Sequence, residues 1–145
     1  MTTTILLVDY SRTIRLLVRA YLVGQGYDFV EVENGATALR AVRRRQPDLV
    51  ICDVFMPGVD GWDFVRALRS DPRPEVQRMP VILVSSKQDK EVARKSMEAG
   101  ADVFLTKPVA DERLTSAVDE LLARAAARKG EVNNGAEPIP RSHGG

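Results

Sequence analysis

Short apolar runs alternate with amphipathic stretches along most of this chain. Four runs consist almost entirely of apolar residues and show no alternation with polar ones: ILLV at 5–8, LVIC at 49–52, VILV at 81–84 and VFL at 103–105. Such uninterrupted runs are typical of strands buried on both faces of a parallel sheet. A fifth run, YDFVEVEN at 27–34, mixes in polar residues and is therefore predicted to be an edge strand.

The segments between the runs carry helical patterns. In the first, apolar residues recur at the spacing of one helix face, namely Ile14, Leu17, Val18, Tyr21 and Leu22. Further helices are predicted in GATALRAVRRRQPD, at 62–70, at 89–98 ending at Gly100, and in the stripe formed by Leu114, Val118, Leu121, Leu122 and Ala125. Strand and helix therefore alternate five times. This order predicts an α/β domain with a doubly wound, five-stranded parallel sheet.

The end of the chain differs from the rest in composition. Residues 1–128 are expected to form one domain, whereas KGEVNNGAEPIPRSHGG at 129–145 has two prolines, four glycines and few large apolar residues. This composition predicts a disordered tail or a linker. The segment also contains the only histidine, His143, so any histidine chemistry is expected to come from a partner molecule.

Composition narrows the class of protein. The 145 residues carry a net charge of +1, which gives no reason to expect nucleic acid or a membrane as a partner, and we interpret the arginine run at 43–45 as a solvated helix face. The single cysteine, Cys52, excludes a disulfide framework, and no apolar run is long enough to span a membrane. We expect a cytoplasmic protein that is a monomer or a weak dimer.

A polar residue whose side chain can bind a ligand or react stands after each of the four buried runs. These residues are Asp9, Asp53 and Ser85, and Lys107 after VFLT. In an open parallel sheet, ligands bind beyond the carboxyl ends of the strands, so the four side chains are expected to meet in one crevice. Each residue alone could be a helix cap or a surface residue, but four of them at four strand ends favour a shared site.

The residue types indicate the chemistry of this site. Two carboxylates and a backbone carbonyl suit Mg²⁺, which prefers few protein ligands and hard oxygen donors. A lysine adds a point charge for an anion, and a hydroxyl can donate a hydrogen bond to the same anion. An aspartate can also act as a nucleophile that takes up a phosphoryl group.

Several motifs carry a family resemblance over residues 4–125. They are ILLVDYSRTIR, PDLVICDVFMPGVDGWDF, MPVILVSS and AGADVFLTKP. With them the chain resembles the receiver domain of two-component response regulators, of the single-domain CheY-like type. The resemblance implies a flavodoxin-like fold with strand order 2-1-3-4-5. It also implies a signalling domain that is not an enzyme but assists its own phosphotransfer and dephosphorylation.

The resemblance implies roles for individual residues of the metal and phosphoryl site. Asp53 matches the phosphoacceptor, and its donor would be a phosphohistidine on a sensor histidine kinase or a histidine phosphotransfer protein. Asp9 matches the first acid of the metal-binding pair. Phe55 matches the residue whose backbone carbonyl binds Mg²⁺, together with the carboxylate of Asp53.

It also implies a switch. Ser85 matches the hydroxyl that turns toward the phosphoryl group, Lys107 the lysine that pairs with that group, and Phe104 the aromatic residue coupled to the change. The Lys107–Pro108 bond is commonly cis in this family. The fourth helix, the fifth strand and the fifth helix would then form the face that contacts a downstream protein. No output domain follows residue 128, so output by protein contact is expected unless the chain is a fragment.

Tyr10 departs from the family pattern, which has a second acid at this position. The absence of this second acid should weaken the attraction for Mg²⁺. It should also reduce the repulsion between the carboxylates of the site. Two functions remain open. One is a phosphorylatable receiver with a weaker metal requirement; the other is a receiver-like module that binds proteins independently of phosphorylation. A flavin-type enzyme is disfavoured because DYSRT lacks a glycine-rich phosphate cradle.

Overall fold

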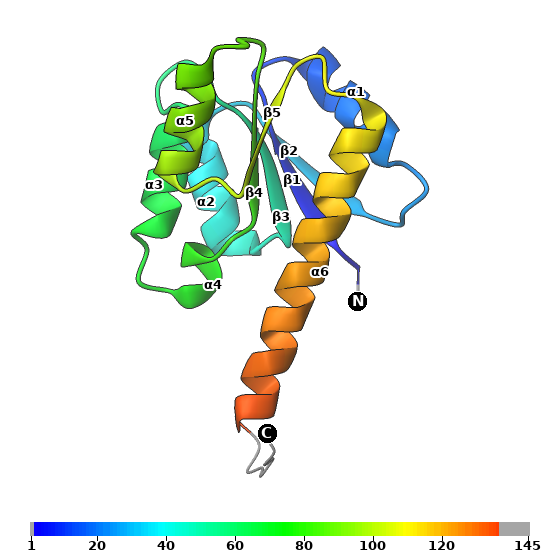
Figure 1. Cartoon of the computed structure of the whole chain (residues 1–145), viewed down its shortest axis with the longest axis vertical. Coiled ribbons are helices and arrows are strands. Elements are labelled where there is room, and N and C mark those ends of the chain that lie inside the picture. Colours follow the sequence, from blue (N-terminus) through cyan, green and yellow to red (C-terminus); the bar gives the residue numbers. More distant parts are fainter. Residues whose placement is uncertain (1, 137–145) are drawn as a thin grey trace.

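The computed structural model describes residues 2–136, which contain a five-stranded parallel sheet. The strands are β1 (Thr4–Val8), β2 (Asp28–Val32), β3 (Leu49–Asp53), β4 (Val81–Ser85) and β5 (Val103–Thr106). Their order across the sheet is β2-β1-β3-β4-β5, and every neighbouring pair is parallel (Figure 1). The predicted α/β class and strand order are confirmed.

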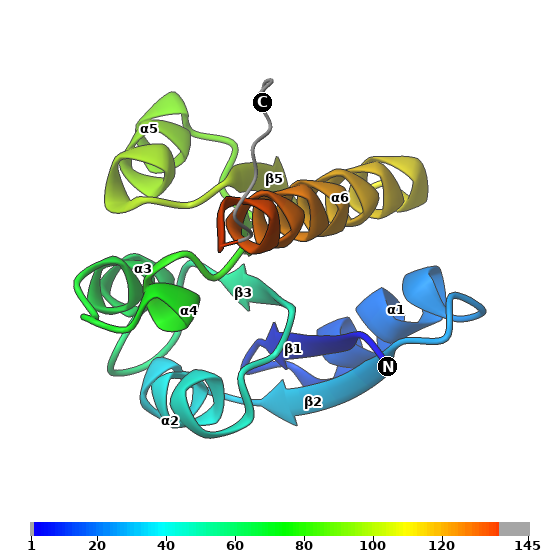
Figure 2. The same cartoon turned by 90° about the horizontal axis from the view of Figure 1, so that it is seen from below.

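Helices cover both faces of this sheet. They are α1 (Arg12–Leu22), α2 (Gly35–Arg45), α3 (Gly61–Arg69), α4 (Pro74–Gln77), α5 (Lys90–Ala99) and α6 (Asp111–Ala136). Figure 2 shows α1 and α6 on one side of the sheet and α2, α3 and α5 on the other. The domain is therefore doubly wound, as the alternation of strand and helix predicts.

Alternating side chains of each central strand feed two separate cores. Leu6 and Val8 of β1 belong to the cluster beneath α2 and α3, whereas Ile5 and Leu7 belong to the cluster beneath α1 and α6. Successive residues of a strand point to opposite faces, so a strand covered on both sides needs apolar residues at every position. The mixed run at β2 lies at the edge of the sheet, and its residues are only partly buried or exposed.

One short helix was not expected from the sequence. The sequence predicts a helix at 62–70 and no helix in the segment DPRPE that follows, but Pro74 begins α4 there. Proline fits the first turn of a helix because that turn needs no backbone N–H donor. The predicted fourth and fifth helices are therefore α5 and α6 of the structure, and α5 ends at Gly100, which has a φ of 114°.

The last helix is longer than expected. The predicted disordered tail or linker begins at residue 129, but α6 continues through residues 129–136. Elongating a formed helix adds one hydrogen bond for each residue fixed, so even residues of low helix propensity can extend it. The rest of the predicted tail, 137–145 with His143, lies outside the described residues. Between residues 2 and 136, no helix is both long and apolar enough to cross a membrane.

Candidate functional site

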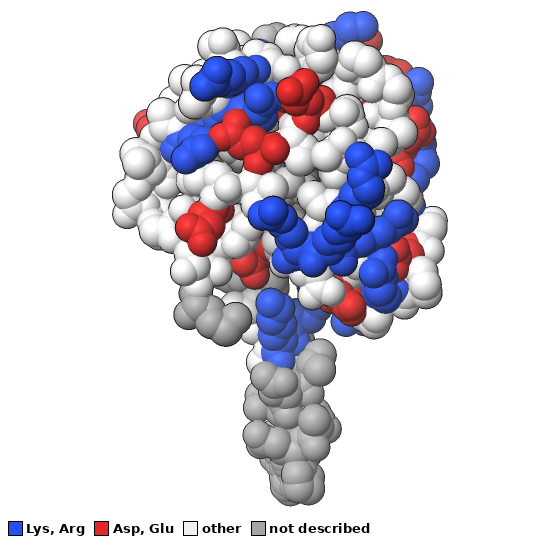
Figure 3. All heavy atoms as spheres, turned by 180° about the vertical axis from the view of Figure 1, so that it is seen from behind, with Lys and Arg blue, Asp and Glu red and all other residues white. Residues whose placement is uncertain are grey.

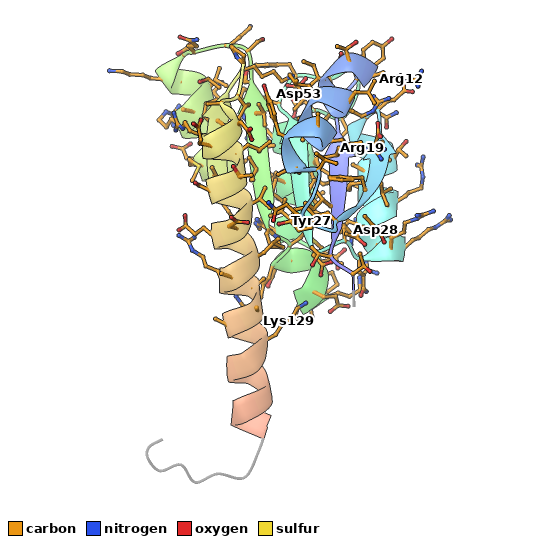
Figure 4. The ribbon with its side chains drawn as sticks, turned by 90° about the vertical axis from the view of Figure 1, so that its right-hand side faces the viewer. Arg12, Arg19, Tyr27, Asp28, Asp53 and Lys129 are labelled. Atoms are coloured by element: carbon orange, nitrogen blue, oxygen red, sulfur yellow. The ribbon has the colours of Figure 1, made fainter. Side chains whose placement is uncertain are left out.

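The four polar residues predicted at the strand ends lie together at the carboxyl ends of the parallel strands. Asp9 follows β1, Asp53 ends β3, Ser85 ends β4 and Lys107 follows β5. The parallel register sets their neighbours, since Asp53 pairs with Val84, the residue before Ser85. Figure 4 shows Asp53 at this end of the sheet, level with the start of α1.

Lys107 joins the two carboxylates. Its Nζ lies 2.9 Å from Oδ2 of Asp9 and 3.4 Å from Oδ1 of Asp53. All three side chains are largely buried, with exposed fractions of 17% for Lys107, 10% for Asp9 and 14% for Asp53. Partial burial strengthens these charge interactions relative to water. The peptide bond between Lys107 and Pro108 is cis.

The environment perturbs the acidity of Asp53. Burial raises the pKa of its carboxyl group above the ordinary value; the nearby Asp9 carboxylate raises it as well, and Lys107 acts in the opposite direction. A titratable group with such a perturbed pKa in a crevice is a candidate functional group. Its carboxylate is poorly stabilised by water, which favours bonding to an electrophile.

Asp9 is held by its own backbone surroundings. Oδ1 accepts a hydrogen bond from the N–H of Ser11 at 2.9 Å, and the backbone carbonyl accepts one from Nη1 of Arg15 at 2.6 Å. Arg15 is itself fixed by Glu31 of β2, at 2.8 Å. The side chain of Asp9 therefore enters the crevice in a defined position.

Arg15 and Glu31 are not among the site residues that the sequence predicts. The available signal was the position of Arg15 three residues before Val18 and seven before Leu22, which places a charged residue beside the apolar stripe of α1. A buried arginine of this kind needs a partner, and Glu31 supplies it.

Ser85 is fully buried, and its Oγ accepts a hydrogen bond from the backbone N–H of Lys87 at 3.0 Å. The hydroxyl proton of Ser85 remains available for donation to another acceptor. Phe104 of β5 is partly buried and packs against the same core cluster that lies beneath α2 and α3. Of the two residues expected to form the switch, Ser85 thus lies at the crevice and Phe104 lies against this core.

The loop after Asp53 is tightly constrained. Gly58 has a φ of 77°, a conformation that favours glycine. A Cβ atom added at Gly61 would lie only 2.6 Å from the backbone oxygen of Asp53. The ring of Phe55 lies edge-on to that of Trp62, with centroids 5.4 Å apart. In this loop the backbone N–H of Phe55 lies beside the carboxylate of Asp53 and acts to lower the pKa of that group.

Tyr10 stands where the family pattern has a second acid, and the residue is 65% exposed. Residues 2–136 hold no group of three or more His, Cys, Asp or Glu side chains that could bind a metal ion together. The donors that the structure brings together are the carboxylates of Asp9 and Asp53, and the resemblance implies the carbonyl of Phe55 as a third. These groups fit Mg²⁺ in chemical kind, with one carboxylate fewer than the family pattern has.

A largely apolar cavity of about 330 Å³ adjoins the charged groups. Its apolar lining includes Ile14, Leu17 and Val18 of α1. Asp53 and Lys107 also line it, so the charged site opens into an apolar surface between α1 and the loop after β5.

The family follows from a direct comparison. The model of the response regulator receiver domain matches residues 5–119, so this chain belongs to the response regulator receiver family. The family resemblance predicted from the motifs is therefore confirmed. Receiver domains of two-component systems are signalling domains.

Individual relatives agree with this assignment. Protein PilH of Pseudomonas aeruginosa is 34% identical over 119 residues, which cover 82% of this chain and 97% of PilH. The DNA-binding response regulator MtrA of Mycobacterium tuberculosis is 33% identical over 120 residues, and this chain spans only about half of its length. In a solved structure, the signal receiver domain of a signal transduction histidine kinase from Syntrophus aciditrophicus has a TM-score of 0.76 and 34% identity, covering 96% of each chain.

Proposed function

We propose that Asp53 accepts a phosphoryl group from a phosphohistidine of a sensor histidine kinase or a histidine phosphotransfer protein. The observation that carries this proposal is the shared ammonium group of Lys107, which contacts both Asp9 and Asp53. A buried carboxylate pair needs such a cation, and the same cation can stabilise charge on an incoming phosphoryl group.

The transfer requires no oxidant or reductant. A carboxylate oxygen of Asp53 forms a bond to phosphorus while the bond from phosphorus to the imidazole nitrogen breaks, and the imidazole keeps the electron pair. The ammonium group of Lys107 lies against the carboxylate that reacts, so it can stabilise the negative charge on the phosphoryl oxygens during transfer. The hydroxyl of Ser85 can donate a hydrogen bond to a phosphoryl oxygen once it turns toward Asp53.

Asp9, Asp53 and the carbonyl of Phe55 would hold Mg²⁺ in this proposal. A bound Mg²⁺ supplies positive charge next to the transferred phosphoryl oxygens. Because Tyr10 stands where the family has a second acid, we expect the metal to bind weakly. Asp9 also holds Lys107 at 2.9 Å, so the protein provides part of the needed charge itself.

The signal would leave through the face formed by α5, β5 and α6, which corresponds to the predicted output face. Phe104 belongs to β5 of this face, and Ser85 ends β4, the strand between β5 and β3, so the two residues would couple this face to Asp53. The expected recipient is a protein, with the domain acting in the cytoplasm as a monomer or a weak dimer; the lack of any disulfide-forming pair supports a reducing compartment.

Nucleic acid is not part of this proposal. Figure 3 shows Lys and Arg side chains gathered on the face opposite to that of Figure 1, with Asp and Glu among them. Helix α2 ends in three arginines, but Arg43 pairs with Asp71 at 3.4 Å, and Arg73 pairs with the same carboxylate at 3.0 Å. Paired charges of mixed sign favour a solvated surface over a phosphate-binding one.

Phosphorylation can be tested with acetyl phosphate as the donor. The wild-type protein, incubated with Mg²⁺ and acetyl phosphate, should gain the mass of one phosphoryl group, and the Asp53→Asn variant should gain none. Intact-protein mass spectrometry measures both. Absence of the adduct in the wild type at high Mg²⁺ concentrations would contradict the proposal.

A second function is favoured by Tyr10 alone. The missing acid leaves two carboxylates at the site, which is consistent with a protein-binding module that acts without phosphorylation. In that case the Asp53→Asn variant should bind a natural partner with unchanged affinity, with and without a phosphodonor. A difference in affinity between phosphorylated and unmodified wild-type protein would exclude this second function.

A further inference from the structure

Lys87 lies at the rim of the crevice, two residues beyond Ser85. Its backbone N–H donates a hydrogen bond to Oγ of Ser85 at 3.0 Å, so its position is tied to the end of β4. Strand β4 pairs with β3, and Asp53 lies opposite Val84 in this register. The loop that carries Lys87 therefore begins beside the strand end that carries the phosphoacceptor.

The side chain of Lys87 rests on an aromatic ring. Its Nζ lies 4.8 Å from the centroid of Phe55, which is two residues beyond Asp53 and 40% exposed. Within the described part of the chain, Lys87 forms no ion pair with a carboxylate, whereas Lys107 forms two. A cation held only by the face of a partly exposed ring is held weakly and can move to a stronger partner.

The charge balance of the crevice supplies that stronger partner. Asp9 and Asp53 already share the charge of Lys107, and a phosphoryl group on Asp53 would add further negative charge that Lys107 alone does not neutralise. The lysine stem is long and flexible, so its ammonium group can reach from Phe55 toward the neighbouring strand end. With one acid fewer for a metal ion, a protein cation at this rim has more to contribute.

We propose that Lys87 leaves the ring of Phe55 and binds the phosphoryl oxygens on Asp53, as a second protein cation of the site. This inference rests on the proposed phosphorylation of Asp53. It assigns Lys87 a direct contact with the transferred group, and Phe55 the task of holding the ammonium group near the crevice before transfer. The bonds made and broken are those of the transfer described above, since Lys87 contributes charge only.

The chain offers a matched control. Lys95 of α5 makes the same kind of contact, with its Nζ 5.4 Å from the centroid of Trp62. Lys95 lies eight residues further along the chain than Lys87, on the helix and away from the end of β4. A general effect of removing one lysine from an aromatic ring should therefore appear equally in both positions.

The test compares Lys87→Met, Lys87→Arg and Lys95→Met with the wild type. The rate constant for phosphorylation of Asp53 by acetyl phosphate is measured by intact-protein mass spectrometry at several Mg²⁺ and salt concentrations. Lys87→Met should be slower by about fivefold at low salt, the effect of one surface-exposed charge contact. Lys87→Arg should keep most of the rate, and Lys95→Met should equal the wild type.

Salt separates a charge contact from a structural role. Because ions screen exposed charges, the ratio of the wild-type rate to the Lys87→Met rate should shrink toward one at high salt. A ratio that stays constant with salt, equal rates for the wild type and Lys87→Met, or an equal loss in Lys95→Met overturns the inference. Circular dichroism of each variant shows whether it is folded, and the exposed position of Lys87 favours retention of the fold.

Failure of this inference differs from failure of the proposed function. If the wild type gains no phosphoryl group, phosphorylation of Asp53 itself is refuted, and with it the role of Lys87. If the wild type is phosphorylated and Lys87→Met reacts equally fast at every salt concentration, only the role of Lys87 is refuted.

Discussion

Lys107 holds two buried carboxylates at once, and this arrangement governs the electrostatics of Asp53. The ammonium group favours the ionised form of Asp53, while burial and the neighbouring Asp9 oppose it. The net result is a raised pKa, because the buried carboxylate is less well hydrated than a carboxylate in water. An incoming group that brings charge compensation, whether metal or phosphoryl with its cations, is therefore favoured at this position.

Tyr10 provides the sharpest test of the metal site at the scale of one residue. Replacing it by aspartate should restore a carboxylate and tighten Mg²⁺ binding by about tenfold, because ligand charge sets the affinity of such sites. Trp62 is the only tryptophan and contacts Phe55, so its fluorescence can follow a Mg²⁺ titration. Tyr10→Phe, which removes only the hydroxyl group, is the control. Equal dissociation constants for the two variants would refute this account of Tyr10.

The residues of the crevice could be predicted because each stands at or just after the end of a buried strand pattern. Asp9, Asp53 and Lys107 meet because parallel strands end at one edge of the sheet. Arg15 and Glu31 could not be paired from the sequence, since they lie on different elements and their contact depends on how α1 crosses the edge strand. Local patterns indicate where a side chain points, but not which distant side chain it meets.

At the scale of elements, the strands were the easiest to predict. Burial on both faces requires apolar residues at every position, and this pattern differs from that of a helix with one apolar stripe. Helix α4 could not be predicted from its pattern, because it is only four residues long and contains a proline, which is unfavourable inside a helix although it can begin one. The end of α6 was missed because glycine and asparagine lower helix propensity without preventing elongation of a formed helix.

Two glycines on helices should respond in opposite directions to substitution by alanine. In Gly61→Ala, the new Cβ would lie 2.6 Å from the oxygen of Asp53 and 2.9 Å from Cα of Val54, so a loss of stability of about 1–3 kcal/mol is expected. Gly130 of α6 has no atom within 4 Å of the added Cβ, so Gly130→Ala should stabilise the protein by about 0.5–1 kcal/mol. Urea unfolding measures both changes.

The Gly61 result also bears on the site. The backbone of α3 approaches Asp53 closely at this glycine, so the substitution should displace Asp53 and slow the proposed phosphorylation. If Gly61→Ala were as stable as the wild type, the close packing of α3 against the end of β3 would be wrong.

At the scale of the whole molecule, the buried charges of the site lower the free energy of unfolding. The crevice contains two carboxylates at the carboxyl ends of the strands, next to the two apolar clusters that pack on the faces of the sheet. Burial of Asp53 favours its neutral form. If Asp53 accepts a phosphoryl group as proposed, its burial serves that reaction at a cost in stability of the unmodified protein. The cost can be measured through the pH dependence of unfolding.

The sign of this dependence follows from the direction of the shift. The pKa of Asp53 is higher in the folded protein than the ordinary carboxyl value of 3.8, so the folded state binds the proton more tightly than the unfolded state. The stabilisation by this proton is complete below the ordinary value and is lost as the pH rises through the raised folded value. At neutral pH, Asp53→Asn should therefore have a larger free energy of unfolding than the wild type, and this difference should disappear in acid.

Lys107 provides the second arm of the experiment. Because Lys107 lowers the pKa of Asp53, its replacement by methionine should enlarge the stabilisation that Asp53→Asn produces at neutral pH. Urea unfolding of the wild type, the two single variants and the double variant at neutral and acid pH gives the coupling between the two sites. A coupling of zero at neutral pH would mean that the 3.4 Å contact between Lys107 and Asp53 does not set the charge balance of the crevice.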